Sequence, residues 1–193
     1  MMDLKSSETA KNLMQAFAGE SQARNRYTFA AAAARKEKLP VIEAVFTFTA
    51  GQEKEHGEIF YNYLAEMTGE TICIDGGYPI DTYSRTLDLL KAARHNEYVE
   101  HDVVYSQFAR TAREEGFSQI SSAFQMIAEI ERIHGDRFQL FADLLEKGQL
   151  FVSEMETGWM CLNCGFVYTG TSAPAVCPVC SHEQGYFIRL EMA

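Results

Sequence analysis

Two short segments of the chain repeat the same pattern of acidic, basic, histidine and glycine residues. Residues 53–60 and 131–138 share the pattern E-[KR]-x-H-G-[DE]-x-F, with an offset of 78 residues. A glutamate and a histidine three residues apart lie on the same face of a helix, so each segment presents a carboxylate and an imidazole together. Glu20 and Glu97 precede the two segments at nearly the same offset, 77 residues. The repeat predicts a duplicated helix pair with one matched set of metal-ligand types.

The acidic residues of this set lie within apolar stripes rather than on polar faces. Spacings of three and four place them among residues such as Leu13, Phe60 and Phe138. Burying an unpaired carboxylate costs several kcal/mol, so these groups need compensating cations in a shared core. Glutamates from two helices and Glu-x-x-His from two others form the ligand set of dinuclear carboxylate bundles, and such ligands suit iron. We therefore predict a site for two metal ions, with the ligands Glu20, Glu53, His56, Glu97, Glu100, Glu131 and His134.

Some of these assignments have alternatives. A single Glu-x-x-His is usually part of a solvated helix face, but two copies within apolar stripes argue against that interpretation. His101 lies four residues after Glu97 and is an alternative ligand to Glu100. Tyr27 and Tyr105 follow Glu20 and Glu97 by seven and eight residues. They either hydrogen-bond a ligating carboxylate or pack as ordinary core aromatic side chains.

Four of the five cysteines lie close to the end of the chain. Cys161 and Cys164 form one C-x₂-C pair, and Cys177 and Cys180 form a second pair after twelve residues. This spacing is typical of tetrahedral coordination of zinc or iron by four thiolates, and the spacing alone does not choose between the two metals. Cys73 has no partner in the sequence and is interpreted as uninvolved.

Long helices must position these ligands. The four prolines leave the windows 41–78 and 80–173 without a helix breaker. Caps and glycines predict four helices, from Ser6 or Ser7 to about Lys38, at about 41–67, at about 83–115 and at about 117–147. Residues 68–82 are too long for a tight hairpin and predict a crossover along the bundle. The expected fold is a ferritin-like four-helix bundle at 1–150, followed at 154–193 by a small metal-bound domain of strands and loops.

Composition and charge exclude several classes of function. The net charge is −10, with 17 basic and 27 acidic residues, so binding to nucleic acid is not expected. The apolar runs are shorter than the roughly 20 residues that a bilayer requires, so no membrane association is expected either. The first residues are polar and acidic and contain no apolar leader pattern. These features favour a cytoplasmic protein.

The ligand order and the four-cysteine tail together closely resemble rubrerythrin along essentially the whole chain. The resemblance implies a non-haem di-iron peroxidase that reduces hydrogen peroxide to water and protects against oxidative stress. It also implies a rubredoxin-like Fe(Cys)₄ centre that feeds electrons to the di-iron site, which favours iron over zinc in the tail. Tyr27 and Tyr105 match tyrosines that support the metal ligands in that family.

The resemblance further implies a role for each ligand. One iron would be held by Glu20 and Glu53 and would exchange between Glu100 and His56 with oxidation state. The other would use Glu97, Glu131 and His134, with Glu53 and Glu131 bridging the two ions. The family also implies a homodimer or small homo-oligomer, in which electrons cross between subunits. The electron donor would be a rubredoxin or a reductase in an NAD(P)H-linked chain, because this chain has no dinucleotide-binding glycine pattern.

One position departs from the family pattern. Gly165 follows Cys164, as is usual in rubredoxin-like metal loops, but Ser181 follows Cys180 where glycine is typical. Glycine allows a positive φ there, so serine is expected to strain the loop or to change its redox potential.

Two other functions are consistent with parts of the sequence. A ferritin-like ferroxidase would oxidise iron(II) for storage and would assemble into a large shell. A structural or regulatory protein would hold zinc in the tail and inert metals in the bundle.

Overall fold

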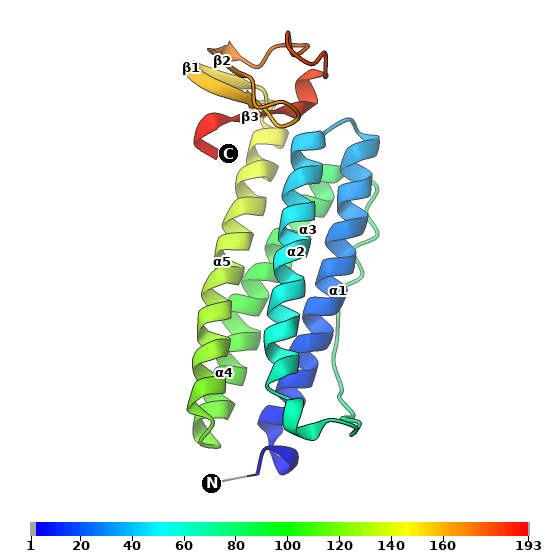
Figure 1. Cartoon of the computed structure of the whole chain (residues 1–193), viewed down its shortest axis with the longest axis vertical. Helices are drawn as coiled ribbons and strands as arrows, with labels where there is room; N and C mark the ends of the chain where they lie inside the picture. The colour runs from blue at the N-terminus through cyan, green and yellow to red at the C-terminus, as the bar shows by residue number, and fades with distance from the viewer. Residues whose placement is uncertain (1–2, 193) are drawn as a thin grey trace.

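The computed structural model describes residues 3–192 and shows a long helical bundle with a small sheet at one end (Figure 1). Its main helices are α1 (Glu8–Lys36), α2 (Pro40–Asn62), α3 (Thr86–Val99), α4 (Tyr105–Glu114) and α5 (Ser118–Glu146). A π-helical turn, Glu100–Val104, joins α3 to α4, so these segments form one continuous helical rod. The predicted four-helix bundle with a long crossover is confirmed.

The helix ends follow the signals in the sequence. The Ser7 hydroxyl accepts a hydrogen bond from the Ala10 amide and caps α1. Pro40 lies in the first turn of α2, where its missing amide proton leaves no hydrogen bond unmade. Gly116 and Gly148 have positive φ angles of 91° and 65°. They follow the ends of α4 and α5, respectively.

Two helices differ from their predicted forms. The second helix ends at Asn62 instead of about residue 67, and a 3₁₀ turn, Ala65–Met67, follows it. Leu64, just before this turn, and Met67, at its end, are both buried in the apolar cluster that contains Phe60. The chain then enters the crossover. The third helix begins at Thr86 rather than at about residue 83 and contains the π-helical turn.

The π-helical turn explains the unequal spacing of the two tyrosines. Tyr27 follows Glu20 by seven residues along a regular helix, whereas Tyr105 follows Glu97 by eight. A π-helical turn takes up one extra residue without changing the face that the later residues present. Both tyrosines therefore point into the bundle, and both are buried.

The core of the bundle has two apolar layers with a charged layer between them. The layer near the tail includes Phe46, Leu90 and Phe138. The layer at the opposite end includes Phe60 and Phe124. Glutamates and histidines form the charged layer between these two apolar layers. The apolar layers therefore exclude water from both ends of the charged layer.

The tail is a three-stranded antiparallel sheet packed on the end of the bundle (Figure 1). Its strands are β1 (Val152–Cys161), β2 (Val167–Ser172) and β3 (Phe187–Arg189), in the order β2-β1-β3. Trp159 and Phe187 fill its small core. A Cβ atom on Gly185 would lie 2.5 Å from the Lys38 carbonyl oxygen, so only glycine allows this close approach between the tail and the α1–α2 turn.

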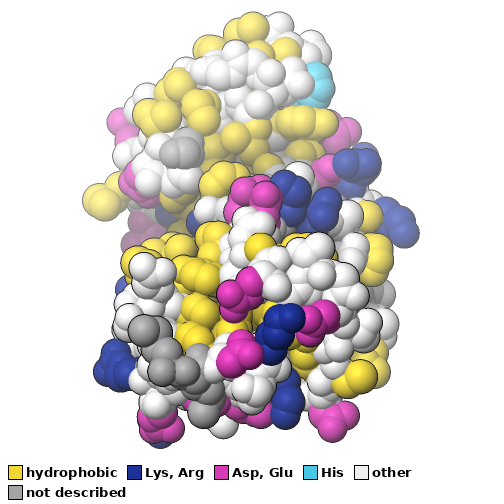
Figure 2. All heavy atoms as spheres, turned by 60° about the horizontal axis from the view of Figure 1, so that its bottom comes forward, with side chains coloured by type: hydrophobic (Ala, Val, Ile, Leu, Met, Phe, Trp, Pro, Cys, Tyr) yellow, Lys and Arg dark blue, Asp and Glu magenta, His cyan; other side chains and the backbone are white. Residues whose placement is uncertain are grey.

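The surface carries charges of both signs. Figure 2 views the molecule with the end opposite the tail turned forward, and acidic and basic side chains are interspersed on that face. Hydrophobic side chains are also visible between them. Among the described residues, none of the helices is long and apolar enough to cross a membrane.

Candidate metal centres

The charged layer of the bundle brings together six of the seven predicted ligands. All six side chains are buried, and they come from four different helices. They form two groups that share two glutamates. The first group is Glu20, Glu53, His56 and Glu131, and the second is Glu53, Glu97, Glu131 and His134.

His56 faces the first group through its Nδ1 atom. This nitrogen lies 3.2 Å from Oε2 of Glu53, 2.9 Å from Oε1 of Glu131 and 3.9 Å from Oε1 of Glu20. Three carboxylates from three helices thus surround one imidazole nitrogen.

His134 has the equivalent position in the second group. Its Nδ1 atom lies 3.1 Å from Oε1 of Glu53, 2.8 Å from Oε2 of Glu131 and 3.6 Å from Oε2 of Glu97. The two oxygens of Glu53 therefore face different histidines, as do those of Glu131, so either carboxylate could be shared between two ions.

The hydrogen bonds of the layer are incomplete, and this supports metal binding. Both carboxylate oxygens of Glu53 and of Glu131 are buried without a well-aligned hydrogen-bond donor. Buried polar atoms in native proteins are nearly always satisfied. One ring proton cannot serve two carboxylates, whereas a cation between the nitrogen and the oxygens would satisfy all of them. The ligand set therefore fits two cations.

The crowding of carboxylates changes their proton affinity. Burial, followed by repulsion from neighbouring carboxylates, raises the pKa of Glu20 and of Glu97 well above the usual value. Burial disfavours a charged His56, but its contacts with Glu131 and Glu53 outweigh this and raise the pKa of its imidazole to about 9. Without metal, the layer is therefore neutralised partly by bound protons.

Two buried tyrosines support the outer carboxylates in a crossed arrangement. The Tyr27 hydroxyl, on α1, donates to Oε1 of Glu97 on α3. The Tyr105 hydroxyl, on α4, donates to Oε1 of Glu20 on α1. Burial and the adjacent carboxylates raise the pKa of both phenols well above 10, so both remain donors. The hydrogen-bonding interpretation therefore holds over simple aromatic packing.

Glu100 lies outside both groups. It is the first residue of the π-helical turn, it is largely but not completely buried, and it lines a pocket between α1 and the crossover. The alternative ligand, His101, hydrogen-bonds the adjacent Asp102 with an Nδ1–Oδ1 distance of 2.7 Å and also lies outside both groups.

One residue near the layer was not identified from the sequence. Arg137 donates hydrogen bonds to Thr49 (2.9 Å) and to Gln52 (3.0 Å), joining α5 to α2 one turn from Glu53. Its guanidinium is half-buried and lies over the Phe48 ring. The signal in the sequence was its position three residues after His134, on the same helix face.

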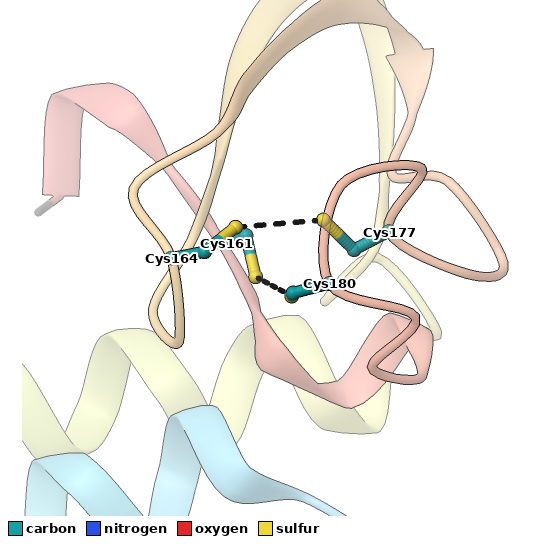
Figure 3. A group of neighbouring side chains, drawn as sticks. All are labelled: Cys161, Cys164, Cys177 and Cys180. Atoms are coloured by element: carbon teal, nitrogen blue, oxygen red, sulfur yellow. Dashed lines mark hydrogen bonds between the residues drawn. The ribbon is translucent and has the colours of Figure 1, made fainter.

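The tail brings its four cysteines together as the spacing predicted (Figure 3). The Cys161 and Cys180 sulfurs lie 3.7 Å apart, as do those of Cys164 and Cys177. A tetrahedral ion with metal–sulfur bonds of about 2.3 Å requires sulfur–sulfur distances of about 3.8 Å. The cluster therefore fits one tetrahedral metal ion.

The two cysteine loops have similar backbone geometry. The Gly165 amide donates to the Cys161 carbonyl, and the Ser181 amide donates to the Cys177 carbonyl. Both residues have a positive φ, 77° for Gly165 and 61° for Ser181. Next to Ser181, the His182 amide lowers the pKa of the Cys180 thiol to about 6 and so favours the thiolate.

Comparisons with known proteins agree with both parts of the chain. The family model described as rubrerythrin matches residues 11–142. A second family model, described as the rubredoxin-like domain of rubrerythrin, matches residues 159–188. Rubrerythrin from Clostridium perfringens is 44% identical over 188 residues, which is 97% of this chain and 96% of that protein.

Solved structures show the same architecture. A mixed-valence state of nigerythrin has a TM-score of 0.64 and 26% identity, over 95% of this chain and 90% of that chain. The bacterioferritin of Desulfovibrio desulfuricans has a TM-score of 0.66 and 20% identity, over 74% of this chain and 82% of that chain, and shows that the bundle has the ferritin-like fold. The charged layer of glutamates and histidines, the four-cysteine tail and these matches lead to one conclusion: the chain belongs to the rubrerythrin family.

Proposed function

We propose that this protein is a non-haem di-iron peroxidase that reduces hydrogen peroxide with two electrons and two protons to two molecules of water. The observation that carries the proposal is the pair of buried carboxylate and histidine groups that share Glu53 and Glu131. A four-cysteine cluster in the same chain supplies a second, one-electron metal site. Residues 1–150 are assigned to the di-iron domain and residues 154–193 to the Fe(Cys)₄ domain.

The geometry supports a specific division of the ligands. Glu20 and His56 would hold one iron, Glu97 and His134 would hold the other, and Glu53 and Glu131 would be shared between them. Glu100, which lies outside both groups, would be the seventh ligand and would replace His56 on the first iron as the oxidation state changes. A pair of ferrous ions bound there would provide the two electrons that reduce the O–O bond, which avoids release of hydroxyl radical.

The chain's own groups control the charge around the site. Tyr27 and Tyr105 hold the outer carboxylates in place through their hydroxyl protons. Burial between the two apolar layers keeps bulk water away from the ligands. In the metal-free protein, burial and repulsion from Glu97 raise the pKa of Glu100 well above its usual value.

Electrons reach the bundle through the tail in this proposal. The protein that donates these electrons to the tail is a rubredoxin, or a reductase that is itself linked to NAD(P)H. Free thiols that bind metal suit the cytoplasm, where thiols are kept reduced. Zinc in the four-cysteine site would block this route, because zinc has no accessible second oxidation state.

The proposed assembly is a homodimer or a small homo-oligomer. Glu131 lies on α5, which continues to Glu146, so about 22 Å of helix separates the ligand layer from the tail end of the bundle at 1.5 Å per residue. Following the expectation from the family, we assign delivery of electrons to the tail of a second subunit. Met126, Ile133 and Leu140 form an exposed apolar stripe at seven-residue spacing on the same helix, which suits packing against a second copy.

The test starts with anaerobically purified, iron-loaded protein. The protein is reduced stoichiometrically, hydrogen peroxide is added, and the thiolate-to-iron absorption of the tail is followed. The proposal expects the band to bleach on reduction and to return rapidly with peroxide, at a stoichiometry that matches three iron ions per chain.

Two results would contradict the proposal. If dioxygen reoxidises the protein rapidly and peroxide does not, iron oxidation explains the bundle better. If the band is absent from native protein or insensitive to peroxide, the tail is structural.

A further inference from the structure

A small pocket lies beside the ligand layer, between α1, the crossover and the π-helical turn. Its volume is about 120 Å³. Glu100 and Tyr105 line it from the helical rod, Gly19 lines it from α1, and Tyr78 lines it from the crossover.

The crossover is firmly attached where it covers this pocket. The Tyr78 hydroxyl donates to the Gln15 carbonyl oxygen at 3.1 Å. A few residues later, Asp81 accepts hydrogen bonds from Arg26 (2.9 Å) and from Asn96 (2.8 Å). The Arg26 and Asp81 side chains are each only 14% exposed, so this ion pair is largely shielded from solvent. The wall of the pocket is therefore a fixed part of the fold.

Two glycines lie next to the Tyr78 ring. A Cβ atom on Gly19 would contact Cε1 of the ring at 3.8 Å. A Cβ atom on Gly76 would lie 3.1 Å from the Tyr78 hydroxyl oxygen, which is tighter than ordinary contact. The ring thus packs over the bare backbone of the residue that immediately precedes Glu20.

The inner end of the pocket lies next to the charged layer, because one lining residue hydrogen-bonds a glutamate of that layer. Tyr105 lines the pocket and donates its hydroxyl proton to Glu20. Glu100 lines the pocket and lies three residues after Glu97, about one turn further along the same helical rod. These two side chains stand between the pocket and the candidate di-iron site.

We propose that this pocket is the access site for hydrogen peroxide and that Tyr78 sets the size limit on the peroxide that enters. The inference rests on the proposed peroxidase function and identifies the substrate class as small, unbranched peroxides. An apolar cavity of about 150 Å³ holds one benzene molecule. A 120 Å³ pocket therefore accepts hydrogen peroxide with water but excludes cumene hydroperoxide, which adds an isopropyl and a peroxide group to such a ring.

The first experiment measures size selectivity without an electron donor. Reduced, iron-loaded protein is mixed with hydrogen peroxide or with cumene hydroperoxide, and the rate constants of reoxidation are compared. Tyr78→Ala removes the ring and is expected to raise the relative rate with cumene hydroperoxide by about tenfold or more. Tyr78→Phe keeps the ring and is expected to retain the selectivity of the natural chain. Tyr83→Ala, in the same crossover but outside the pocket, is the matched control.

The second experiment follows binding without turnover. Gln15 lines the pocket from α1 and is partly exposed, so Gln15→Trp fills the pocket without altering a ligand. Azide is mixed with the oxidised, iron-loaded protein, and its association rate is read from the absorption change. Gln15→Trp is expected to slow azide association by about tenfold and to leave the final spectrum unchanged. Lys11→Trp, one turn earlier and outside the pocket, is expected to change neither.

The outcomes separate the two proposals. If hydrogen peroxide does not reoxidise the natural protein, the proposed function fails. If hydrogen peroxide does so, but Tyr78→Ala leaves the selectivity unchanged and Gln15→Trp leaves azide association unchanged, the peroxidase function stands and the access site is wrong.

Discussion

Ser181 was expected from the sequence to strain its cysteine loop, and its backbone conformation gives this expectation a physical basis. Its φ of 61° lies in the left-handed region, where a residue with a Cβ atom is strained by about 1–2 kcal/mol. Gly165 takes the same conformation in the other cysteine loop without strain. The predicted strain of this loop is therefore supported by the backbone geometry.

Replacing this serine tests the strain directly. Ser181→Gly is expected to stabilise the metal-loaded tail by about 1 kcal/mol, measured as slower loss of the thiolate–metal absorption during denaturant unfolding. Ser172→Gly is the control, because Ser172 lies in β2, where glycine destabilises a strand by roughly 0.5–1 kcal/mol. Equal effects of the two substitutions would contradict the assignment of strain to Ser181.

The protonation of the ligand layer predicts how the metal-free protein responds to pH. The pKa of His56 is raised to about 9, and those of Glu20, Glu97 and Glu100 are raised above their usual range. The folded state then binds more protons than the unfolded state between the unfolded pKa of histidine and about 9. Stability must therefore fall as the pH rises through this window.

Denaturant unfolding of metal-free protein at several pH values checks this prediction. We expect a lower unfolding free energy at pH 9.5 than at pH 7, and a weaker dependence after iron is bound, because metal replaces the protons. Metal-free protein that becomes more stable with rising pH would contradict the proposed protonation.

At the scale of elements, the π-helical turn keeps two halves of one helical rod in phase with their neighbours. The segment Glu100–Val104 takes up the one residue by which the Glu97–Tyr105 spacing exceeds the Glu20–Tyr27 spacing. A single-residue deletion in the turn would restore the regular spacing that α1 already has. The same deletion in α1 would rotate the following residues by about 100°.

Two matched deletions test this account. Deleting Val103, which is 56% exposed, is expected to leave a folded bundle with a stability change no larger than the roughly 0.5–3 kcal/mol of an ordinary substitution. Deleting the exposed Arg24 is expected to turn Tyr27 out of the core and to prevent stable folding. Thermal unfolding followed by circular dichroism distinguishes them, and similar losses in both variants would argue against the compensating role of the turn.

At the scale of the whole molecule, the tail can dock on the bundle because Gly185 has no side chain. A Cβ atom there would lie 2.5 Å from the Lys38 carbonyl oxygen and 2.7 Å from Cδ of Pro40. Both contacts are with rigid groups that cannot move aside. The docking of the two parts therefore requires that residue 185 has no Cβ atom.

Gly185→Ala is expected to displace the tail at a cost of about 1–3 kcal/mol, the usual penalty for overpacking. Small-angle X-ray scattering should show a larger radius of gyration, while the absorption of the four-cysteine site is retained. Gly51→Ala serves as the control, because a Cβ atom at that helical position meets no atom within 4 Å. An unchanged scattering profile for Gly185→Ala would mean that the tail accommodates the methyl group.

The sequence alone was sufficient to predict the six side chains that meet in the charged layer, the helices that carry them and the four-cysteine cluster. Helical periodicity shows which residues share a face, so the two Glu-x-x-His motifs and their glutamate partners could be grouped before any coordinates. The positions of Pro40, Gly116 and Gly148 likewise indicated where the helices end.

Only the tertiary structure decided how the faces meet. Periodicity within one helix does not specify the height or rotation of its neighbour, so it could not show that Tyr27 bonds Glu97 while Tyr105 bonds Glu20. It also could not show that Glu100 lies beside a pocket rather than in either ligand group, because that depends on the crossover packed against α1. Contacts between distant segments arise from packing, and packing is a property of the whole chain.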